Sequence, residues 1–460
     1  MNGTALLAAV ALPVLLGLLG SRLAAALAAP GDGALYRITL YVMGGAVVAH
    51  VALTLLDLAR VPWSPLLLAA LWAVLCGLAY RLLPRGPDRA RLPSDFGWGE
   101  GVALFALAAF TLVALTAWIA MPDFIYHWGV KAHHYYLARG VDYVYLAKSW
   151  NWYTHPDYPN LVPELFALTA LLAGGFDEPA MMLVTGVVFA LLLAATREGL
   201  RRGGADRFTR QAGLVLVALA IAAFGVGHLM AGAADWMLAL ALAAAVPPLL
   251  RPPDRTGDFQ IAAAAAFAAA AKLEGIPLAG FLALVQLARR LPTERRPNFA
   301  AALRLGLPIA AVVLPWMGRM RYHHLSLAIG SGPFQSSRAG EIFRSVLEAV
   351  GTPAWHGFVF AAFLPPLLLL HRRTRPFATA ATLQLLFYFY PYFTGRVDDV
   401  RFFVLSNFAR LTFQLVPACL VAALVVWGGN EKGGDEPRPC ETLERPASQR
   451  RGVTTLTTLL

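Results

Sequence analysis

The feature that most constrains this chain is a series of apolar runs, each about as long as a bilayer's hydrocarbon core is thick. A helix that crosses a membrane needs about 20 apolar residues, and its backbone polar groups must bond within the helix. The runs lie at residues 4–28, 36–58, 63–83, 99–120, 179–197, 211–231, 235–250, 301–318, 354–371, 376–393 and 411–428. With residues 258–290 as a hairpin of two shorter runs, this pattern predicts an all-α polytopic membrane protein with about 13 transmembrane helices.

The charge of the chain agrees with a membrane location. Only 14% of the residues are charged, whereas a soluble domain has about 25%. The formal net charge of +11 would point to nucleic acid in a soluble protein, but here the basic residues fall in short loops between apolar runs. No basic stripe lies on a soluble domain, so we expect no nucleic-acid partner.

The basic loops also predict the orientation. The main basic clusters lie at residues 85–91, 197–210, 251–255, 289–296 and 372–375. All of them face the cytoplasm, as the positive-inside rule requires, only if the apolar run at 161–174 does not cross the membrane. That run is also short for a span and suits an interfacial or re-entrant segment. The N-terminus is then outside and the C-terminus inside.

Polar and aromatic side chains are concentrated in residues 121–160, between two apolar runs. They include Asp123, His127, Trp128, Lys131, His133, His134, Asp142, Lys148, Trp150, Trp152, His155, Asp157 and Tyr158. Tryptophan and tyrosine favour the membrane interface, and ionisable groups there are usually functional. We therefore expect a large outer loop, containing juxtamembrane helices, that carries the chemistry of the protein.

Three residues of this loop share one side of a predicted helix. Asp123 follows Pro122 at the end of an apolar run, so its carboxylate lies where the chain leaves the membrane. His127 and Lys131 follow at intervals of four residues, which places all three side chains on one face. This face suits an anionic, sugar-like ligand. A solvated interface acid and a lysine that extends to the membrane surface are the alternative interpretation.

Two later segments bring further charges to the predicted outer face. Asp235 begins an apolar run after Gly232-Ala233-Ala234, where its carboxylate either acts on a substrate or only caps a helix. Lys272 and Glu274 cannot share a helix face at their spacing, so we place them in the turn of the predicted hairpin.

Three arginines are candidate ligands for a phosphate group. Arg319, Arg321 and Arg410 fall on the predicted outer face, and a guanidinium group binds phosphate oxygens through two hydrogen bonds. Contact with lipid headgroups is the alternative. The histidines and three cysteines, Cys76, Cys419 and Cys440, show no spaced set of ligands, so we expect neither a structural zinc site nor a disulfide framework.

A series of short motifs follows the same order as in a known superfamily. The motifs are Asp123 in the first large outer loop, Trp128 to Ala132, HPDYPNLVPE at 155–164, GAAD at 232–235, AKLEG at 271–275, and Ser406 with Arg410 and Pro417. The series resembles that of the GT-C superfamily of membrane glycosyltransferases. It is similar to bacterial polyprenyl-phosphate-sugar enzymes such as protein O-mannosyltransferases and the aminoarabinose transferases of lipid A. Ala233 stands where the family has tyrosine and Leu273 where it has asparagine.

The resemblance implies an organisation and a reaction. Residues 1–98 would be N-terminal transmembrane helices outside the common core, and residues 99–428 a GT-C-like catalytic domain with its outer loop at 121–178. Residues 429–460 form a polar segment that we expect to be a disordered cytoplasmic tail. The enzyme would move a sugar, with inversion, from a polyprenyl phosphate to a glycan, lipid or protein acceptor. The reaction would take place at the outer, periplasmic face of the cytoplasmic (inner) membrane.

The resemblance also implies roles for individual residues. Asp123 would be the catalytic base, with Asp235 as a second catalytic acid. If a divalent cation, Mg²⁺ or Mn²⁺, takes part, these two carboxylates would hold it. The implied substrate-binding residues are His127, Trp128, Lys131, His155, Asp157, Tyr158, Lys272, Glu274, Arg319, Arg321 and Arg410.

Two other functions compete with the transferase. A transporter or flippase for a lipid-linked or anionic solute would also need charges at one face. The sequence shows neither an inverted repeat nor a matching pair of broken helices in two halves. A non-catalytic membrane scaffold would not need acids clustered with arginines on one face.

Overall fold

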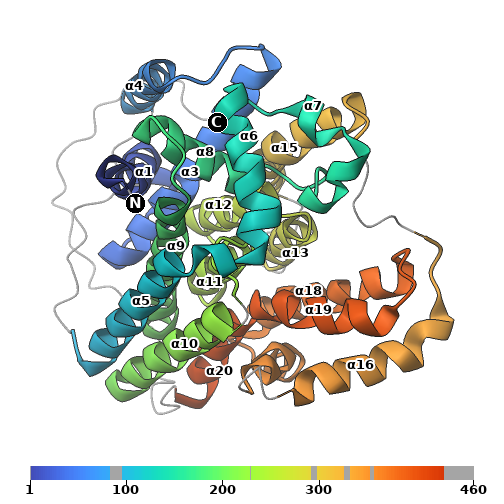
Figure 1. Ribbon diagram of the computed structural model, residues 1–460. Coiled ribbons are helices and arrows are strands. Elements are labelled where there is room, and N and C mark those ends of the chain that lie inside the picture. The colour runs from blue at the N-terminus through green and yellow to red at the C-terminus, as the bar shows by residue number, and fades with distance from the viewer. Residues whose placement is uncertain are drawn as a thin grey trace, which may run out of the picture. The chain divides into compact units, whose positions relative to one another are not determined.

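The protein is built of helices. The computed structural model describes residues 2–82, 96–227, 229–291, 298–325, 332–352 and 357–428, and no β-strand occurs among them (Figure 1). The predicted class, all-α, is therefore confirmed for these residues. The predicted tail at 429–460 and the basic cluster at 85–91 lie outside the described residues.

The helices follow one another along the chain with short connections. The N-terminal half contains α1 (Gly3–Ser21), α2 (Ala24–Leu27), α3 (Ala34–Leu58), α4 (Pro65–Leu82), α5 (Trp98–Thr116), η1 (Trp118–Ala120), η2 (Phe124–Trp128), α6 (Gly129–Ala138), α7 (Tyr143–Leu146), η3 (Ser149–Thr154), α8 (Leu161–Ala173), α9 (Glu178–Arg202) and α10 (Arg207–Gly227). The C-terminal half contains α11 (Asp235–Leu249), α12 (Arg255–Ala271), α13 (Gly275–Ala288), α15 (Phe299–Tyr322), η4 (Ser336–Arg338), α16 (Ala339–Gly351), η6 (Phe358–Phe363), α17 (Leu364–Leu368), α18 (Arg375–Thr394), α19 (Val400–Phe413) and α20 (Val416–Gly428).

Six of these helices are long and apolar enough to cross a membrane. They are α1, α3, α5, α9, α10 and α15, and α19 with α20 makes a seventh if this pair, bent by 51°, is one span. The chain is thus a multi-pass, all-α membrane protein. The predicted count of about 13 spans is not confirmed, because several predicted runs form shorter helices, such as α11 with 15 residues and α13 with 14.

The apolar run at 161–174 forms α8, a helix of 13 residues. Its side chains are almost all buried, and it packs against α1 and α6. The surrounding protein covers the apolar side chains of this helix. The helix therefore does not need to be long enough to cross the membrane.

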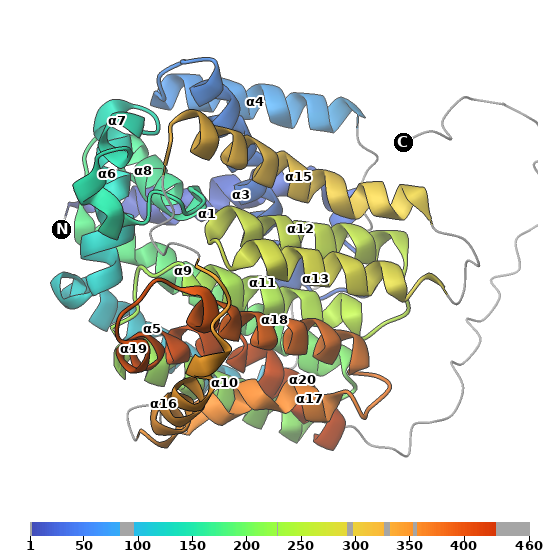
Figure 2. The same cartoon turned by 90° about the vertical axis from the view of Figure 1, so that its right-hand side faces the viewer.

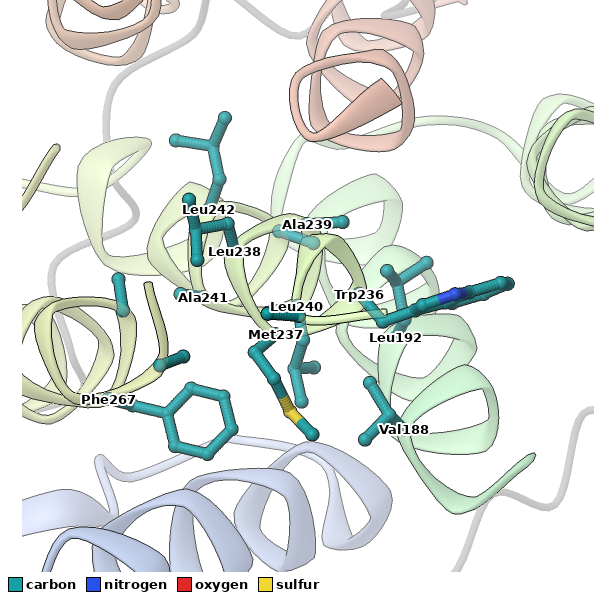
Figure 3. Close-up of a cluster of buried hydrophobic side chains, with 14 of the residues drawn as sticks. Val188, Leu192, Trp236, Met237, Leu238, Ala239, Leu240, Ala241, Leu242 and Phe267 are labelled. Atoms are coloured by element: carbon teal, nitrogen blue, oxygen red, sulfur yellow. The ribbon is translucent and has the colours of Figure 1, made fainter. Parts of the chain in front are cut away.

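Helix α11 occupies the centre of the bundle. Each of its residues is buried, as expected for a helix that is apolar on all sides. Figure 3 shows Met237 of α11 beside Phe267 of α12, with Trp236 on another side of the helix. The Trp236 ring packs against Phe110 and Phe413, with ring centroids 5.0 and 5.1 Å apart. This packing fixes the start of α11, where Asp235 lies.

The predicted hairpin is present as α12 and α13. The two helices pack along each other, and only Lys272, Leu273 and Glu274 connect them. Figure 2 shows α6, α7 and α19 at one end of the pair α12 and α13. Segments that are far apart in the sequence therefore meet at that end.

Helices α1 and α3 approach each other at the level of the backbone. A Cβ atom on Gly20 would lie 1.8 Å from the carbonyl oxygen of Tyr41, and one on Gly45 would lie 1.9 Å from that of Leu16. Small residues permit such close approach between helices in membranes. Glycine is the only residue that fits at both positions, because a backbone carbonyl cannot move aside as a side chain can.

Replacing one of these glycines should destabilise the protein. We expect Gly45→Ala to lower the free energy of unfolding by about 1–3 kcal/mol through overpacking. A Cβ atom on Gly77 of α4 would meet nothing within 4 Å, so Gly77→Ala should leave stability unchanged or raise it by up to about 1 kcal/mol. Thermal unfolding of both variants in detergent checks this expectation, and equal effects would contradict it.

Candidate active site

The first part of the site is the helical segment after α5. The turn η2 is π-helical, runs directly into α6, and closes with a hydrogen bond from Gly129 N–H to the carbonyl of Phe124. π-Type turns within helices are frequent at functional sites. Asp123 lies at the start of this turn, His127 within it and Lys131 one turn later.

The side chains of His127 and Lys131 hold the following loop. The His127 Nδ1–H donates to the carbonyl of Tyr153. Lys131 Nζ donates to the carbonyl of His155 at 2.8 Å and lies 5.0 Å from the centre of the Trp128 ring. These bonds position His155, whose backbone has a left-handed conformation with φ 50°.

Asp123 contacts the far end of the chain. Its carboxylate forms an ion pair with Nη2 of Arg410 on α19. The same nitrogen donates to Asp235 Oδ2 at 3.1 Å, so one guanidinium group bridges two acids. Nε and Nη1 of Arg410 have no hydrogen-bond partner among the described residues. Because a guanidinium group carries five N–H donors, Arg410 keeps most of its donors for a ligand.

Asp235 accepts hydrogen bonds from more side chains than any other acid that the structure describes at the site. Its side chain has no exposed surface. Lys272 Nζ donates to Oδ1 at 2.9 Å and Gln414 Nε2 donates to the same oxygen at 2.6 Å. Lys272 also lies 3.3 Å from Glu274 Oε1. Burial of a charge is tolerated only when it is paired and hydrogen-bonded, as it is here.

A cavity of about 210 Å³ lies in front of these groups. Charged and polar side chains form one wall, and aromatic rings of α18 and α19 form another. The lining residues are Asp123, His127, Trp128, His155, Tyr158, Lys272, Leu273, Glu274, Phe387, Tyr388, Tyr390, Pro391, Tyr392, Thr394, Gly395, Phe403, Asn407, Arg410 and Leu411. The side chain of Arg410 is 27% exposed, in contrast to the fully buried Asp235.

Burial changes the protonation of three bases near the cavity. It lowers the pKa of His127, against the opposing effect of Asp123. It also lowers the pKa of His155 to about 2, to which the charge of His127 adds. Burial lowers the pKa of Lys131 to about 7, although the nearby carboxylate of Asp157 acts in the opposite direction. Both imidazoles are therefore neutral at pH 7.

The predicted site residues divide into three groups: those that line the cavity, those that are buried without lining it, and two arginines that lie elsewhere. Asp123, His127, Trp128, His155, Tyr158, Lys272, Glu274 and Arg410 line the cavity. Lys131, Asp157 and Asp235 are buried and do not line it. Asp235 contacts Lys272 and Arg410, which both line the cavity, but does not line it itself.

Arg319 and Arg321 do not belong to this cavity, which corrects their grouping with Arg410. Arg319 Nη2 lies 3.1 Å from Asp57 Oδ2 and donates to the carbonyl of Thr54. It lines a separate cavity of about 680 Å³, and Arg321 is exposed and lines neither cavity. Both lie at the end of α15, which packs against α3 and α12 rather than against α19.

The residues proposed as metal ligands are a poor fit to a divalent cation. The Arg410 guanidinium lies between Asp123 and Asp235, where a cation shared by the two carboxylates would have to sit. No group of three or more His, Cys, Asp or Glu side chains within the described ranges is arranged to hold a metal ion.

Several residues of the site were not predicted from the sequence. Gln414 and Tyr388 form a relay behind Asp235, because the Tyr388 hydroxyl donates to Gln414 Oε1 at 2.5 Å. Tyr390, Tyr392 and Phe403 form the aromatic wall. The run FYFYPYF at 387–393 was the available clue, since tyrosine is unusual in so apolar a helix.

Comparisons with known proteins give no further information on the site. No protein-family model matches the chain, and neither a curated protein nor a solved structure matches it.

The low pKa of Lys131 predicts a pH-dependent contribution to stability. Below pH 7 the buried amine is charged in both states, which penalises the folded state. Between pH 7 and 10.5 only the unfolded state binds the proton, so stability rises with pH by about 1.4 kcal/mol per unit. Relative to wild type, Lys131→Met should therefore be more stable at pH 6 than it is at pH 9, because only the wild type gains stability over this range. Unfolding curves of both proteins at the two pH values check the sign, and a constant difference would contradict it.

Proposed function

We propose that the protein is a GT-C-type membrane glycosyltransferase that moves a sugar from a polyprenyl-phosphate donor to an acceptor of the cell envelope. The observation that carries the proposal is the arrangement around Arg410. A guanidinium group with unused donors and a carboxylate line one small cavity. Transfer from a lipid phosphate needs such a pair, one group for the phosphate and one for the acceptor proton.

The leaving phosphate is assigned to Arg410. The Nε and Nη1 donors of Arg410 are free of protein partners in the described ranges and belong to a side chain that lines the cavity. Two parallel N–H donors match the oxygens of a phosphate. Lys272 adds a second positive charge at the cavity wall, held by Asp235 and Glu274.

The acceptor proton is assigned to Asp123. Three carboxylates, Asp123, Asp235 and Glu274, face two cationic groups, Lys272 and Arg410. Asp235 has three partners, whereas Asp123 has only Arg410 among the described residues. Phosphate bound at Nε and Nη1 shares the positive charge of Arg410, which weakens the ion pair between Nη2 and Asp123, and the Asp123 carboxylate then accepts the proton.

The reaction is a single displacement at the anomeric carbon. The acceptor oxygen forms a bond to this carbon while the bond to the phosphate oxygen breaks. The electron pair leaves with the polyprenyl phosphate, and the acceptor proton goes to Asp123. A cavity of about 210 Å³ is below the usual 300–1,000 Å³ of small-molecule sites, which suits one sugar ring with the lipid tail outside.

The proposal includes the finer topology. About 13 membrane-embedded helices, some shorter than a full span, surround the site. It opens at the outer face of the cytoplasmic membrane, and the basic loops face the cytoplasm. The acceptor is a glycan, lipid or protein.

Transfer from a panel of radiolabelled polyprenyl-phosphate sugars tests this function directly. The purified protein in nanodiscs should release label from at least one donor, and Asp123→Asn should reduce turnover by about 10²- to 10⁴-fold, as expected for loss of a general base. Asp206→Asn, an exposed control on a distant loop, should retain activity. Turnover that survives in Asp123→Asn would move the base elsewhere. No turnover of any donor by folded protein would contradict the transferase and favour transport.

The competition for Arg410 gives a second prediction. Asp123→Asn should bind sugar-free polyprenyl phosphate about 5- to 30-fold more tightly than wild type, equivalent to about 1–2 kcal/mol, because the phosphate no longer shares the charge of Arg410 with this carboxylate. Glu274→Gln removes an equal charge that contacts Lys272 instead, and its effect should be smaller. Binding is measured by ligand-induced thermal stabilisation. Weaker binding by Asp123→Asn would show that Asp123 supports the phosphate rather than competing with it.

A further inference from the structure

The cavity of the candidate site contains an unusual number of unpaired polar atoms. Trp128 Nε1, His155 Nδ1, Glu274 Oε2 and Tyr392 Oη are buried and have no hydrogen-bond partner within the described part of the chain. All four side chains line the same cavity. An unsatisfied buried polar atom destabilises a protein substantially, and native structures contain few of them. Their concentration around one small space points to a polar ligand there.

The chemistry of these atoms restricts the ligand. The indole nitrogen of Trp128 can only donate, and the carboxylate oxygen of Glu274 can only accept. The Tyr392 hydroxyl does both. The His155 imidazole is neutral because burial lowers its pKa to about 2, so Nδ1 donates or accepts according to tautomer. Hydroxyl groups satisfy all four atoms because each hydroxyl donates and accepts. A carboxylate can only accept hydrogen bonds and so cannot satisfy Glu274 Oε2, and an ammonium group can only donate them and so cannot satisfy Glu274 Oε2 and Trp128 Nε1 together.

We propose that Tyr392 is a specificity-determining residue whose hydroxyl group binds a hydroxyl of a neutral sugar, held in the cavity against Trp128, His155 and Glu274. The inference rests on the proposed function in treating the sugar as part of a lipid-linked donor. It goes beyond that function by excluding acidic sugars and by naming residues that read the sugar rather than the phosphate.

The chain offers a matched control for Tyr392. Tyr388 lies one turn earlier on α18, lines the same cavity and is equally buried, with 1% of its surface exposed against 0% for Tyr392. Its hydroxyl, however, is already bonded to Gln414. The two tyrosines therefore share a helix, a cavity and their degree of burial, and differ in whether the hydroxyl group has a partner in the described part of the protein.

Stability of the two phenylalanine variants separates a ligand-binding role from a structural one. Tyr392→Phe removes a hydroxyl that has no hydrogen-bond partner among the described residues, so its unfolding temperature should equal or exceed that of wild type. Tyr388→Phe leaves Gln414 Oε1 unpaired and should lower the unfolding temperature by about 1–3 °C. A clear loss of stability in Tyr392→Phe would show that its hydroxyl has a structural partner and would overturn the inference.

Binding to defined lipids tests the specificity. The probes are short-chain prenyl phosphates that carry a neutral hexose, a neutral pentose, a hexuronate or no sugar. Wild type should bind at least one neutral-sugar lipid more tightly than the sugar-free and hexuronate lipids. Tyr392→Phe should weaken binding of that lipid by about 5- to 100-fold and leave binding of the sugar-free lipid unchanged.

The outcomes distinguish this inference from the proposed function. Equal weakening of sugar-bearing and sugar-free lipids by Tyr392→Phe, or tighter binding of the hexuronate lipid to wild type, would overturn the inference while leaving transfer intact. Sugar-dependent binding through Tyr392 without transfer to any acceptor would support the inference and contradict the transferase. If wild type binds none of the lipids, both fall.

Discussion

The neutralisation of Asp235 is the interaction on which the rest of the site depends. A carboxylate without exposed surface must be paired, because an uncompensated buried charge costs about 3–5 kcal/mol. Its partners come from separate parts of the chain: Lys272 from the turn between α12 and α13, Arg410 from α19, and Gln414 from the bend before α20. Folding of the helix bundle therefore assembles the site, and Arg410 extends this pairing to Asp123 at the start of η2.

The polar groups around the cavity are of two kinds. Some are hydrogen-bonded to the protein backbone, and others have no hydrogen-bond partner among the described residues. Lys131 and His127 are bound to backbone carbonyls and fix the loop, whereas Glu274 and Tyr392 present unpaired atoms to the cavity. Unpaired atoms of this kind lower the stability of the free protein, and natural proteins retain such local costs mainly at functional sites. The surrounding packing, with Trp236 locked against Phe110 and Phe413, offsets that cost next to the site.

Much of this arrangement could be predicted from the sequence. The helical class follows from the apolar runs, and two residues of the predicted face, Asp123 and His127, line the cavity, whereas Lys131 does not. The remainder depends on contacts between distant segments. Arg319 was assigned to the phosphate because its type fits, but the sequence gives no sign that Asp57 binds it. The count of about 13 spans stays a prediction, because hydropathy does not distinguish a helix that faces lipid from one that, like α11, is enclosed by other helices.

The π-helical turn at Phe124–Trp128 has a consequence for how this protein can diverge. Such a turn holds one residue more than an α-helical turn would, and each residue of an α-helix accounts for about 100° of rotation. Loss of a single residue from this turn would swing the Asp123 carboxylate away from Arg410 while Lys131 kept its contacts. The geometry of the site is therefore set by the length of this segment as much as by its side chains. An insertion or deletion in this segment would therefore disrupt the site even if His127 and Trp128 were both kept.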